Sequence, residues 1–499
     1  MILVSGEGQV YAWGLFGLIG FPLAAAAASF TVSSVRGTAW TQFGFSLMNA
    51  VLATIMLFNI VGREAVSVFD GWIRLDAFAA YTVWLTIVVG GLASLHSIGY
   101  IGRELRDGAV TVGRYRQYYA GLHLFVLSMM LIAMMNHIGI LWVAVEATTL
   151  ISALLIAFRN GGAALEAAWK YLIIGGLGIA LALFGIILLF AAIPAESVQD
   201  QLMWTDFIRR ASELNPVLVK VAFLFILVGF GTKAGLAPMH FWLPDAHSQA
   251  PSPVSALLSA ALLHTALYAV IRIKLIVDLV EPGFSGGLLI VFGLISLAVT
   301  VPFFLVQHDL KRLLAYSSVE HMGILALGFG VGGAASFGAL LHMFNHAMGK
   351  SMLFFSAGSI MQRYHSKRMD RIHGLLRSMP FTGSAFAVGA FAIAGSPPFS
   401  LFLSEYTIAA AAFRNGQWMA GVLFLTCVVL IFSGMAYYIA QMLFGSNGHR
   451  IESRAEEDGT KAAALAVPLF LLLLFGLYVP PFFRELLNWT IQTLRGVPS

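Results

Sequence analysis

The feature that most constrains this chain is the recurrence of long apolar runs. About fourteen runs of roughly 20 residues, the length that crosses the hydrocarbon core of a bilayer as a helix, follow one another from Tyr11 to about residue 480. Of the 499 residues, 59% are hydrophobic and 11% are charged, which excludes a set of soluble domains. We therefore predict an all-α polytopic membrane protein with about 14 transmembrane helices, and its environment is the lipid bilayer.

The distribution of charge predicts topology and excludes other classes. If the N-terminus is outside, the inner connections hold about twice as many Lys and Arg as the outer ones, as cytoplasmic retention of basic residues requires. We expect a multi-pass protein of the inner (plasma) membrane with both termini on the outer, periplasmic side. The net charge of +5 is spread over many short loops, so no nucleic-acid partner is predicted. The single cysteine, Cys427, cannot hold an iron–sulfur cluster, and we expect no cofactor in this chain.

Proline interrupts two of the runs in similar ways. The seventh run breaks at Pro238 within "AGLAPMHFWLP", and the twelfth breaks at Pro397 and Pro398 within "IAGSPPFSLFLSEY". Proline removes a backbone donor, and in lipid the freed carbonyls need protein or water partners. Paired interruptions of this kind indicate an internal repeat with ion sites near the midplane. The two breaks are five runs apart, and five is odd, so we predict two inverted five-helix repeats, helices 4–8 and helices 9–13.

This repeat divides the chain into four predicted parts. They are residues 1–117 (helices 1–3), 118–280 (the first repeat), 281–443 (the second repeat) and 444–499 (helix 14 and a short C-terminal tail). No connection between the runs is long enough for a soluble domain. Function is therefore expected inside the membrane or at contacts with other chains.

Ionisable side chains inside the apolar runs are the candidates for function, because each costs about 2.5–3.5 kcal/mol at a helix centre. Glu146 stands in the middle of the fifth run, and Lys233 stands five residues before Pro238. Burial favours the neutral form of a lysine, whereas a nearby carboxylate favours the charged form. Such a lysine can load and unload a proton. The alternatives are a purely structural Glu146–Lys233 pair and a Glu146 satisfied by a neighbouring hydroxyl.

The eleventh run carries a ladder of titratable groups. His342, His346 and Lys350 follow at spacings of four residues, which places them on one face of a helix over about 12 Å. A zinc site is the rival interpretation, since two histidines one turn apart can chelate zinc. The third rung is a lysine and no acidic residue is adjacent, so no metal is predicted.

Further candidates for the same proton pathway stand in the neighbouring runs; they are His264, Glu320, His321 and Glu405. A single buried histidine is more often a core residue than a relay, but histidine titrates near neutral pH, and several polar residues occur together here. Glu320 and His321 are adjacent and are expected to point to different sides of their helix. Lys311 is expected to be an interfacial anchor.

Several stretches resemble one known superfamily. They are "WVAVEATTL", "KAGLAPMHFWLPDAHSQAPSPVSALLS", "DLKRLLAYSSVEHMG" and "HMFNHAMGKSMLFFSAGSI". In this order they resemble the antiporter-like membrane subunits shared by respiratory complex I, Mrp cation/proton antiporters and membrane-bound group 4 hydrogenases. "VEATTLISALLIAF" and the Glu-His pair of "SSVEHMG" are most similar to hydrogenase-4 component F and its relatives.

The resemblance implies a fold and roles for particular residues. The fold would have fourteen core helices, two inverted repeats that each form a half-channel, and a central polar axis. Glu146 and Lys233 match the interacting pair of the family, His346 and Lys350 match the relay positions of helix 11, and Glu405 matches the exit in helix 12. His264 stands where some relatives carry lysine, a departure that weakens any claim that helix 8 supplies a lysine here, although a histidine can still relay protons.

These observations predict a proton-translocating, antiporter-like membrane subunit of a complex I-like or membrane-bound hydrogenase-type complex. Its role would be to couple redox energy from partner subunits to proton transfer without catalysing a reaction itself. The expected partners are other membrane subunits and a peripheral redox or carbon-hydrating module, and the ion is H+, with Na+ as the alternative. The other readings are an Mrp-type cation/proton antiporter subunit, the proton-driven module of an inorganic-carbon transport complex, and a structural anchor with inert charges.

Overall fold

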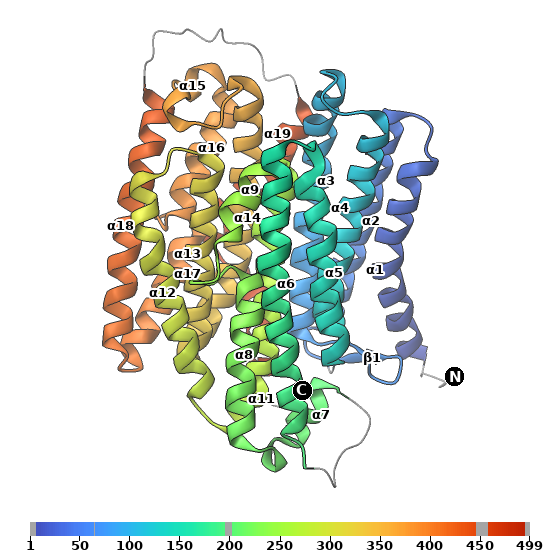
Figure 1. The fold of residues 1–499 in the computed structure, drawn as a ribbon, viewed down its shortest axis with the longest axis vertical. Coiled ribbons are helices and arrows are strands. Elements are labelled where there is room, and N and C mark those ends of the chain that lie inside the picture. Colours follow the sequence, from blue (N-terminus) through green and yellow to red (C-terminus); the bar gives the residue numbers. More distant parts are fainter. Residues whose placement is uncertain (1–5, 64, 195–201, 446–457, 495–499) are drawn as a thin grey trace.

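The computed structural model describes residues 6–63, 65–194, 202–445 and 458–494, and it is a bundle of long helices (Figure 1). The elements in chain order are α1 (Gly6–Thr31), α2 (Val35–Ile60), β1 (Val66–Val68), β2 (Ile73–Leu75), α3 (Ala77–Arg106), α4 (Val112–Met134), α5 (Ile138–Ile156), η1 (Ala157–Arg159), α6 (Gly162–Ala191), α7 (Trp204–Arg209), η3 (Ala211–Glu213), α8 (Pro216–Ala234), α9 (Trp242–Gln249), α10 (Ser252–Leu257), η4 (Leu258–Leu262), α11 (Leu263–Val280), α12 (Phe284–Val306), α13 (Leu310–Val331), α14 (Ala334–Tyr364), η5 (Met369–Arg371), α15 (Leu375–Ser378), α16 (Pro380–Ile393), α17 (Ser400–Arg414), α18 (Trp418–Phe444), α19 (Gly459–Leu477) and α20 (Pro481–Leu494). The strands β1 and β2 pair antiparallel, with Val66 opposite Leu75.

The helices confirm the all-α polytopic class. Within the described ranges, 12 helices are long and apolar enough to cross a membrane. Two further segments occupy the positions of the predicted eleventh and twelfth helices. They are α14, which has 31 residues but carries many polar side chains, and the pair α16 and α17, which the second proline break divides. The count of about fourteen spans stays a prediction.

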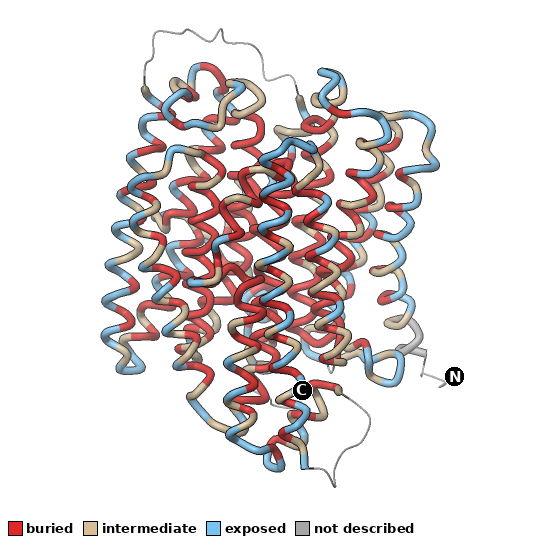
Figure 2. The backbone as a smooth tube through the Cα atoms, viewed as in Figure 1, coloured by how far each residue is buried: buried red, intermediate tan, exposed pale blue. Residues whose placement is uncertain are grey.

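Burial separates a central set of helices from a peripheral one (Figure 2). In the run from α10 to α11 the whole of the most apolar window is buried, and in α13 the share is 94%, against 33% in α2, α12 and α18. The helix α14 packs on α10, α13 and α17, and almost every side chain in its middle is buried. The most polar long helix therefore lies where lipid is most distant, which is where polar side chains are least costly in a membrane protein.

The two proline breaks have the same backbone geometry. The helix α8 ends before Gly235, whose φ is +76°, and Pro238 follows three residues later; α16 ends before Gly395, whose φ is +73°, and Pro398 follows three residues later. Positive φ is strained for residues with a Cβ, so glycine is the residue that such a helix end requires. The paired interruptions in the sequence are thus matched in the structure.

Hydrogen bonds at the two breaks also correspond. Leu236 donates its backbone N–H to the carbonyl of Gly231 at 2.9 Å, and Ser396 donates to the carbonyl of Phe391 at 3.1 Å. In both cases the bond closes the last turn by reaching back five residues, which satisfies a carbonyl that the break would leave free. The assignment of two inverted repeats, and the limits of the four predicted parts, stay predictions.

Basic residues from distant loops gather at one end of the bundle. A cavity of about 970 Å³ lies among α2, α3, α14 and α19, and its lining includes Arg36, Arg103, Arg106, Arg363 and Lys461. These five residues come from connections that the charge distribution assigned to one side of the membrane. Their proximity supports the prediction that these connections lie on the same side of the membrane. Which side that is stays a prediction.

Candidate functional site

The first group of buried polar side chains surrounds Lys233. This lysine lies in the last turn of α8, just before the first break, and only 1% of it is exposed. Its Nζ donates to Thr149 Oγ1 at 2.8 Å and to the Tyr171 hydroxyl, and it lies 4.6 Å from the centroid of the Tyr171 ring. Tyr171 in turn shares a hydrogen bond of 2.7 Å with Ser152. Two hydroxyls and an aromatic face thus hold a buried amine.

Glu146 lies near this group, but no hydrogen bond joins it to the group among the described residues. It stands on α5 one turn before Thr149, and its Oε2 atom is buried with no hydrogen-bond partner among the described residues. No ion pair within 4.0 Å joins Glu146 to Lys233 in the described part of the chain, and the sequence had left open whether the two come close enough to pair. The two side chains still interact electrostatically across the gap. A buried carboxylate oxygen without a partner is costly.

The second group is built from four buried histidines on α11, α13 and α14. His264 Nε2 and His346 Nδ1 are 2.9 Å apart, and so are His321 Nδ1 and His342 Nε2. The ring centroids of His321 and His346 lie 5.0 Å apart, so the two pairs are neighbours, although among the described residues no hydrogen bond joins these two rings. In each hydrogen bond one ring nitrogen carries the hydrogen that the other accepts. The four rings therefore form a series of proton donors and acceptors.

An irregular turn places His264 in this series. The segment Leu258–Leu262 is a π-helical turn between α10 and α11. A π-turn spans one residue more than an α-turn, so it rotates all later side chains about the helix axis. The sequence predicted a regular helix here, and the direction of the His264 ring could not be foreseen from it.

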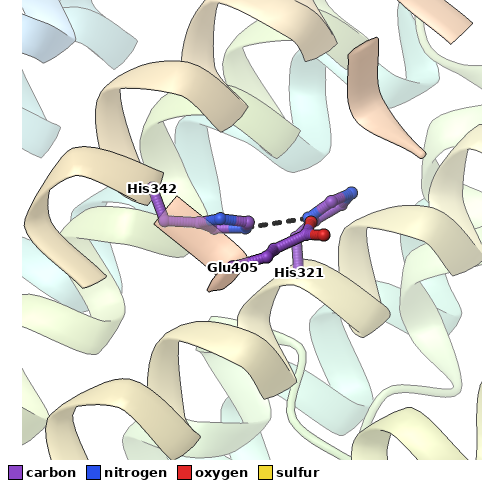
Figure 3. Close-up of side chains that lie close together, drawn as sticks. All are labelled: His321, His342 and Glu405. Carbon is purple, nitrogen blue, oxygen red and sulfur yellow. Dashed lines mark hydrogen bonds between the residues drawn. The ribbon is translucent and has the colours of Figure 1, made fainter. Parts of the chain in front are cut away.

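Two carboxyl groups and a lysine border the histidines. Glu320 Oε2 lies 4.0 Å from His321 Nε2, although we expected these neighbours to point to different sides of the helix. Lys350 continues the ladder of α14, and its Nζ donates to a backbone carbonyl of α13 at 2.9 Å. Glu405 lies in the second turn of α17, beyond the second break, and it is 7% exposed. Figure 3 shows its carboxyl group beside the rings of His321 and His342.

Three side chains in Figure 3 come close enough to share one small ion or proton. One ring nitrogen of His321, one ring nitrogen of His342 and one carboxylate oxygen of Glu405 all lie within 4.8 Å of one another. Ser404 Oγ lies 2.9 Å from His342 Nδ1 and fixes the orientation of that ring. The acidic group that the histidine ladder lacks along its own helix is thus supplied by another helix.

The structure brings together all the predicted residues of the second half and His264, whereas Glu146 and Lys233 form a separate group. Within the described ranges, side-chain hydrogen bonds do not run unbroken from Lys233 to His264. Sequence reasoning missed Thr149, Tyr171 and Ser404, which hold the titratable groups in place. The only signal for them was a hydroxyl inside an otherwise apolar run.

One prediction about an anchor was wrong. Lys311 is 1% exposed, and its Nζ donates to the carbonyl of Ala250 at 2.6 Å. Ala250 lies between α9 and α10, so this lysine ties the start of α13 to the segment that follows the first break. It is an internal connection and is not an anchor in the headgroup region.

A buried ion pair outside both groups was also not foreseen. Arg272 on α11 is 1% exposed and contacts Asp76, which caps α3 through the backbone N–H of Ala79 at 2.9 Å. The guanidinium also lies 4.5 Å from the ring centroid of Trp204 and 4.7 Å from that of Tyr268. Direct contact between the opposite charges makes this pair a structural feature, unlike the separated Glu146 and Lys233.

Comparison with known proteins finds similarity to one family of membrane proteins. The family model described as NADH:quinone oxidoreductase/Mrp antiporter, transmembrane, matches residues 135–431. A hydrogenase-4 component F homolog of Methylacidiphilum infernorum is 36% identical over 458 residues, which are 90% of this chain and 93% of that protein.

Solved structures share the fold. A chain of the membrane-bound sulfane sulfur reductase, an archaeal respiratory membrane complex, superposes with a TM-score of 0.85 at 26% identity, covering 97% of both chains. A chain of the Mrp complex from Dietzia sp. DQ12-45-1b superposes with a TM-score of 0.84 at 21% identity, again over 97% of both chains. The second likeness concerns the fold alone.

Proposed function

This chain belongs to the NADH:quinone oxidoreductase/Mrp antiporter transmembrane family, and from that premise we propose that it is a proton-translocating, antiporter-like subunit of a complex I-like or hydrogenase-type membrane complex. The observation that carries the proposal is the buried series of His264, His346, His321 and His342, which ends beside Glu405 at the second break. Each member can bind or release a proton. Titratable groups are costly inside a membrane, and those that occur there typically mark ion or proton pathways.

The first group supplies the charge that drives the series. Lys233 is held by two hydroxyls, while the Glu146 carboxylate acts on it from a distance. A conformational change that brings Glu146 nearer stabilises the ammonium, and one that takes it away favours release of a proton. The proton then passes through water to His264 and along the histidines to Glu405. Moving one charge against 100 mV costs about 2.3 kcal/mol, which a change of about two pKa units supplies.

The proposal includes a setting for the chain. We place it in the plasma membrane with both termini outside, because the connections that carry most Lys and Arg would then be cytoplasmic. Other membrane subunits are its partners, as in the multisubunit complexes that share its fold. A peripheral redox module would start the cycle, and the transported ion is H+.

The test is proton uptake by vesicles that contain the native assembly, with wild type and Lys233→Ala compared at equal assembly levels. We expect uptake to be lost in Lys233→Ala while redox turnover by the partner persists or slows, with no dependence on sodium. His123→Gln, which removes a buried histidine of α4 outside both groups, is the control and should pump normally.

Three outcomes would contradict the proposal. Unchanged pumping in Lys233→Ala would make this lysine structural. A requirement for sodium without any redox partner would instead identify an Mrp-type cation/proton antiporter subunit. Copurification with a soluble carbonic-anhydrase-like protein would point to inorganic-carbon transport.

A further inference from the structure

The geometry points to a binding site for one divalent transition-metal ion of the zinc class, formed by His321, His342 and Glu405 (Figure 3). These ligands come from α13, α14 and α17. Along α14 alone, His342, His346 and Lys350 lack an acidic ligand, which is why the sequence predicted no metal. In the structure His342 instead lies beside a histidine of α13 and a carboxylate of α17.

The donor atoms fit such an ion. Two imidazole nitrogens and one carboxylate oxygen form the ligand set that zinc takes in sites with an open fourth position. One ligand atom of each residue lies within 4.8 Å of the others, and the facing nitrogens of His321 and His342 are 2.9 Å apart. Two nitrogens on a tetrahedral ion at 2.0–2.1 Å stand about 3.3 Å apart. The rings need to separate only by a few tenths of an ångström.

The second nitrogen of His342 already has a hydrogen-bond partner, and that of His321 has a carboxylate nearby. Ser404 Oγ lies 2.9 Å from His342 Nδ1, and Glu320 Oε2 lies 4.0 Å from His321 Nε2, which has no hydrogen-bond partner among the described residues. Metal-binding histidines use their second nitrogen in this manner, donating to a hydroxyl, a carbonyl or a carboxylate. The groups that would orient the ligands are therefore present before any ion binds.

Charge also favours a divalent ion here. Glu405 would bind the ion directly and Glu320 stands behind His321, so two carboxylates are available to balance two positive charges. A buried ion needs that balance, because water is excluded. Lys350 is the cation that faces this group from α14, and its charge interacts with Glu320. Binding of the ion would favour release of the Lys350 proton.

The second proline break lies beside the site. Pro397 and Pro398 are exposed, and Gly395 lies so close to the Glu405 carboxyl group that a side chain at this position would collide with it. Glu405 is buried and 7% exposed, and both histidines are 0% exposed. An ion would first meet the carboxylate and then the two rings.

A bound ion would interrupt the proton series. The ion uses the lone pairs of both facing nitrogens, so the hydrogen that His321 and His342 share must leave that position. Proton transfer between the two rings then stops, and the ion acts as a reversible inhibitor. This effect on transport rests on the proposed function, whereas binding of the ion does not.

The binding test uses Co²⁺ as a spectroscopic probe for the purified full chain in lipid nanodiscs after chelator treatment. We expect one Co²⁺ per chain, with the intense visible absorption of a tetrahedral N/O site, displaced by Zn²⁺. His342→Gln and Glu405→Gln should abolish this signal, and Ser404→Ala should weaken affinity about 10–100-fold because it only orients a ligand. His123→Gln should bind as the wild type does.

Three results would overturn the site. These are less than one Co²⁺ per chain, an unchanged spectrum in His342→Gln and Glu405→Gln, or an unchanged affinity in Ser404→Ala. Because Ser404→Ala removes only a hydroxyl, it decides the matter if the ligand variants fail to fold.

A second measurement separates binding from transport. Zn²⁺ is added to vesicles that contain the native assembly, and proton uptake is followed. Inhibition that disappears in Ser404→Ala at the same Zn²⁺ concentration supports both proposals. Stoichiometric Co²⁺ binding without any inhibition would leave the site intact and remove the histidines from the proton pathway.

Discussion

The two proline breaks share one backbone geometry, but different side chains stand beside them. At the first break a single lysine is held by hydroxyls, and the nearest carboxylate interacts with it without contact. Beyond the second break, two hydrogen-bonded histidine pairs lie among two carboxyl groups and a lysine. The break therefore supplies polar backbone and space, and the neighbouring helices decide its use. The first group is suited to hold and release one charge, and the second is suited to pass protons on.

Within the second group, the largest loss of transport should follow a change at His321. This residue bonds to His342 and its ring neighbours that of His346, so it joins the two pairs. His321→Gln should lower proton uptake by at least about 100-fold, because a positioned proton-transfer group typically contributes about 100- to 10,000-fold. Uptake is measured at equal assembly levels, with His123→Gln as the control. A loss below about tenfold would mean that protons do not pass through this junction, and the contrast between the groups would fail.

A smaller loss is expected at Tyr171. Tyr171→Phe keeps the ring beside Lys233 and removes the hydroxyl that the amine contacts. A hydrogen bond to a charged group contributes about 1.5–3 kcal/mol, and the lower end of that range corresponds to a fall of about tenfold in the uptake rate. Tyr118→Phe is a matched control, since its hydroxyl bonds to Ser97 at 2.8 Å outside both groups. An equal effect of the two substitutions would show that Lys233 is not held as described.

The smallest effect on transport is expected at the Arg272–Asp76 pair. Arg272→Met leaves a buried carboxylate without its partner and should destabilise the protein by about 3–5 kcal/mol. The amount of assembled protein should drop, while uptake per assembled complex stays the same. The double variant that adds Asp76→Asn should recover part of the stability. Reduced uptake per complex in Arg272→Met would place this pair in the transport pathway and weaken the distinction between contacting and separated charges.

The sequence predicted features that depend on one helix at a time. Apolar runs located the spans, glycine and proline located both breaks, and spacing placed His342 and His346 on one face, where their rings lie 6.4 Å apart. Ionisable residues inside apolar runs identified the members of both groups. Such signals follow from the cost of polar groups in lipid.

Features that depend on how helices face one another could not be predicted. Helical periodicity does not say which neighbour a face meets, so the approach of Glu405 to His321 and the contact of Tyr171 with Lys233 appeared only in the structure. The π-turn before His264 changes the direction of that ring, and nothing in the residues Leu258–Leu262 marks it. For the same reason the sequence left open whether Glu146 and Lys233 touch, and in the structure only their charges interact.

The hydrogen bond between His264 and His346 has a mechanical consequence. It joins α11, in residues 118–280, to α14, in residues 281–443, with its two nitrogens 2.9 Å apart. Moving the two nitrogens apart by about 1 Å along the line that joins them would carry them beyond hydrogen-bonding distance. Under the proposed function, proton transfer between His264 and His346 therefore depends on the distance between α11 and α14, and movement of the two parts of the bundle away from each other would stop it.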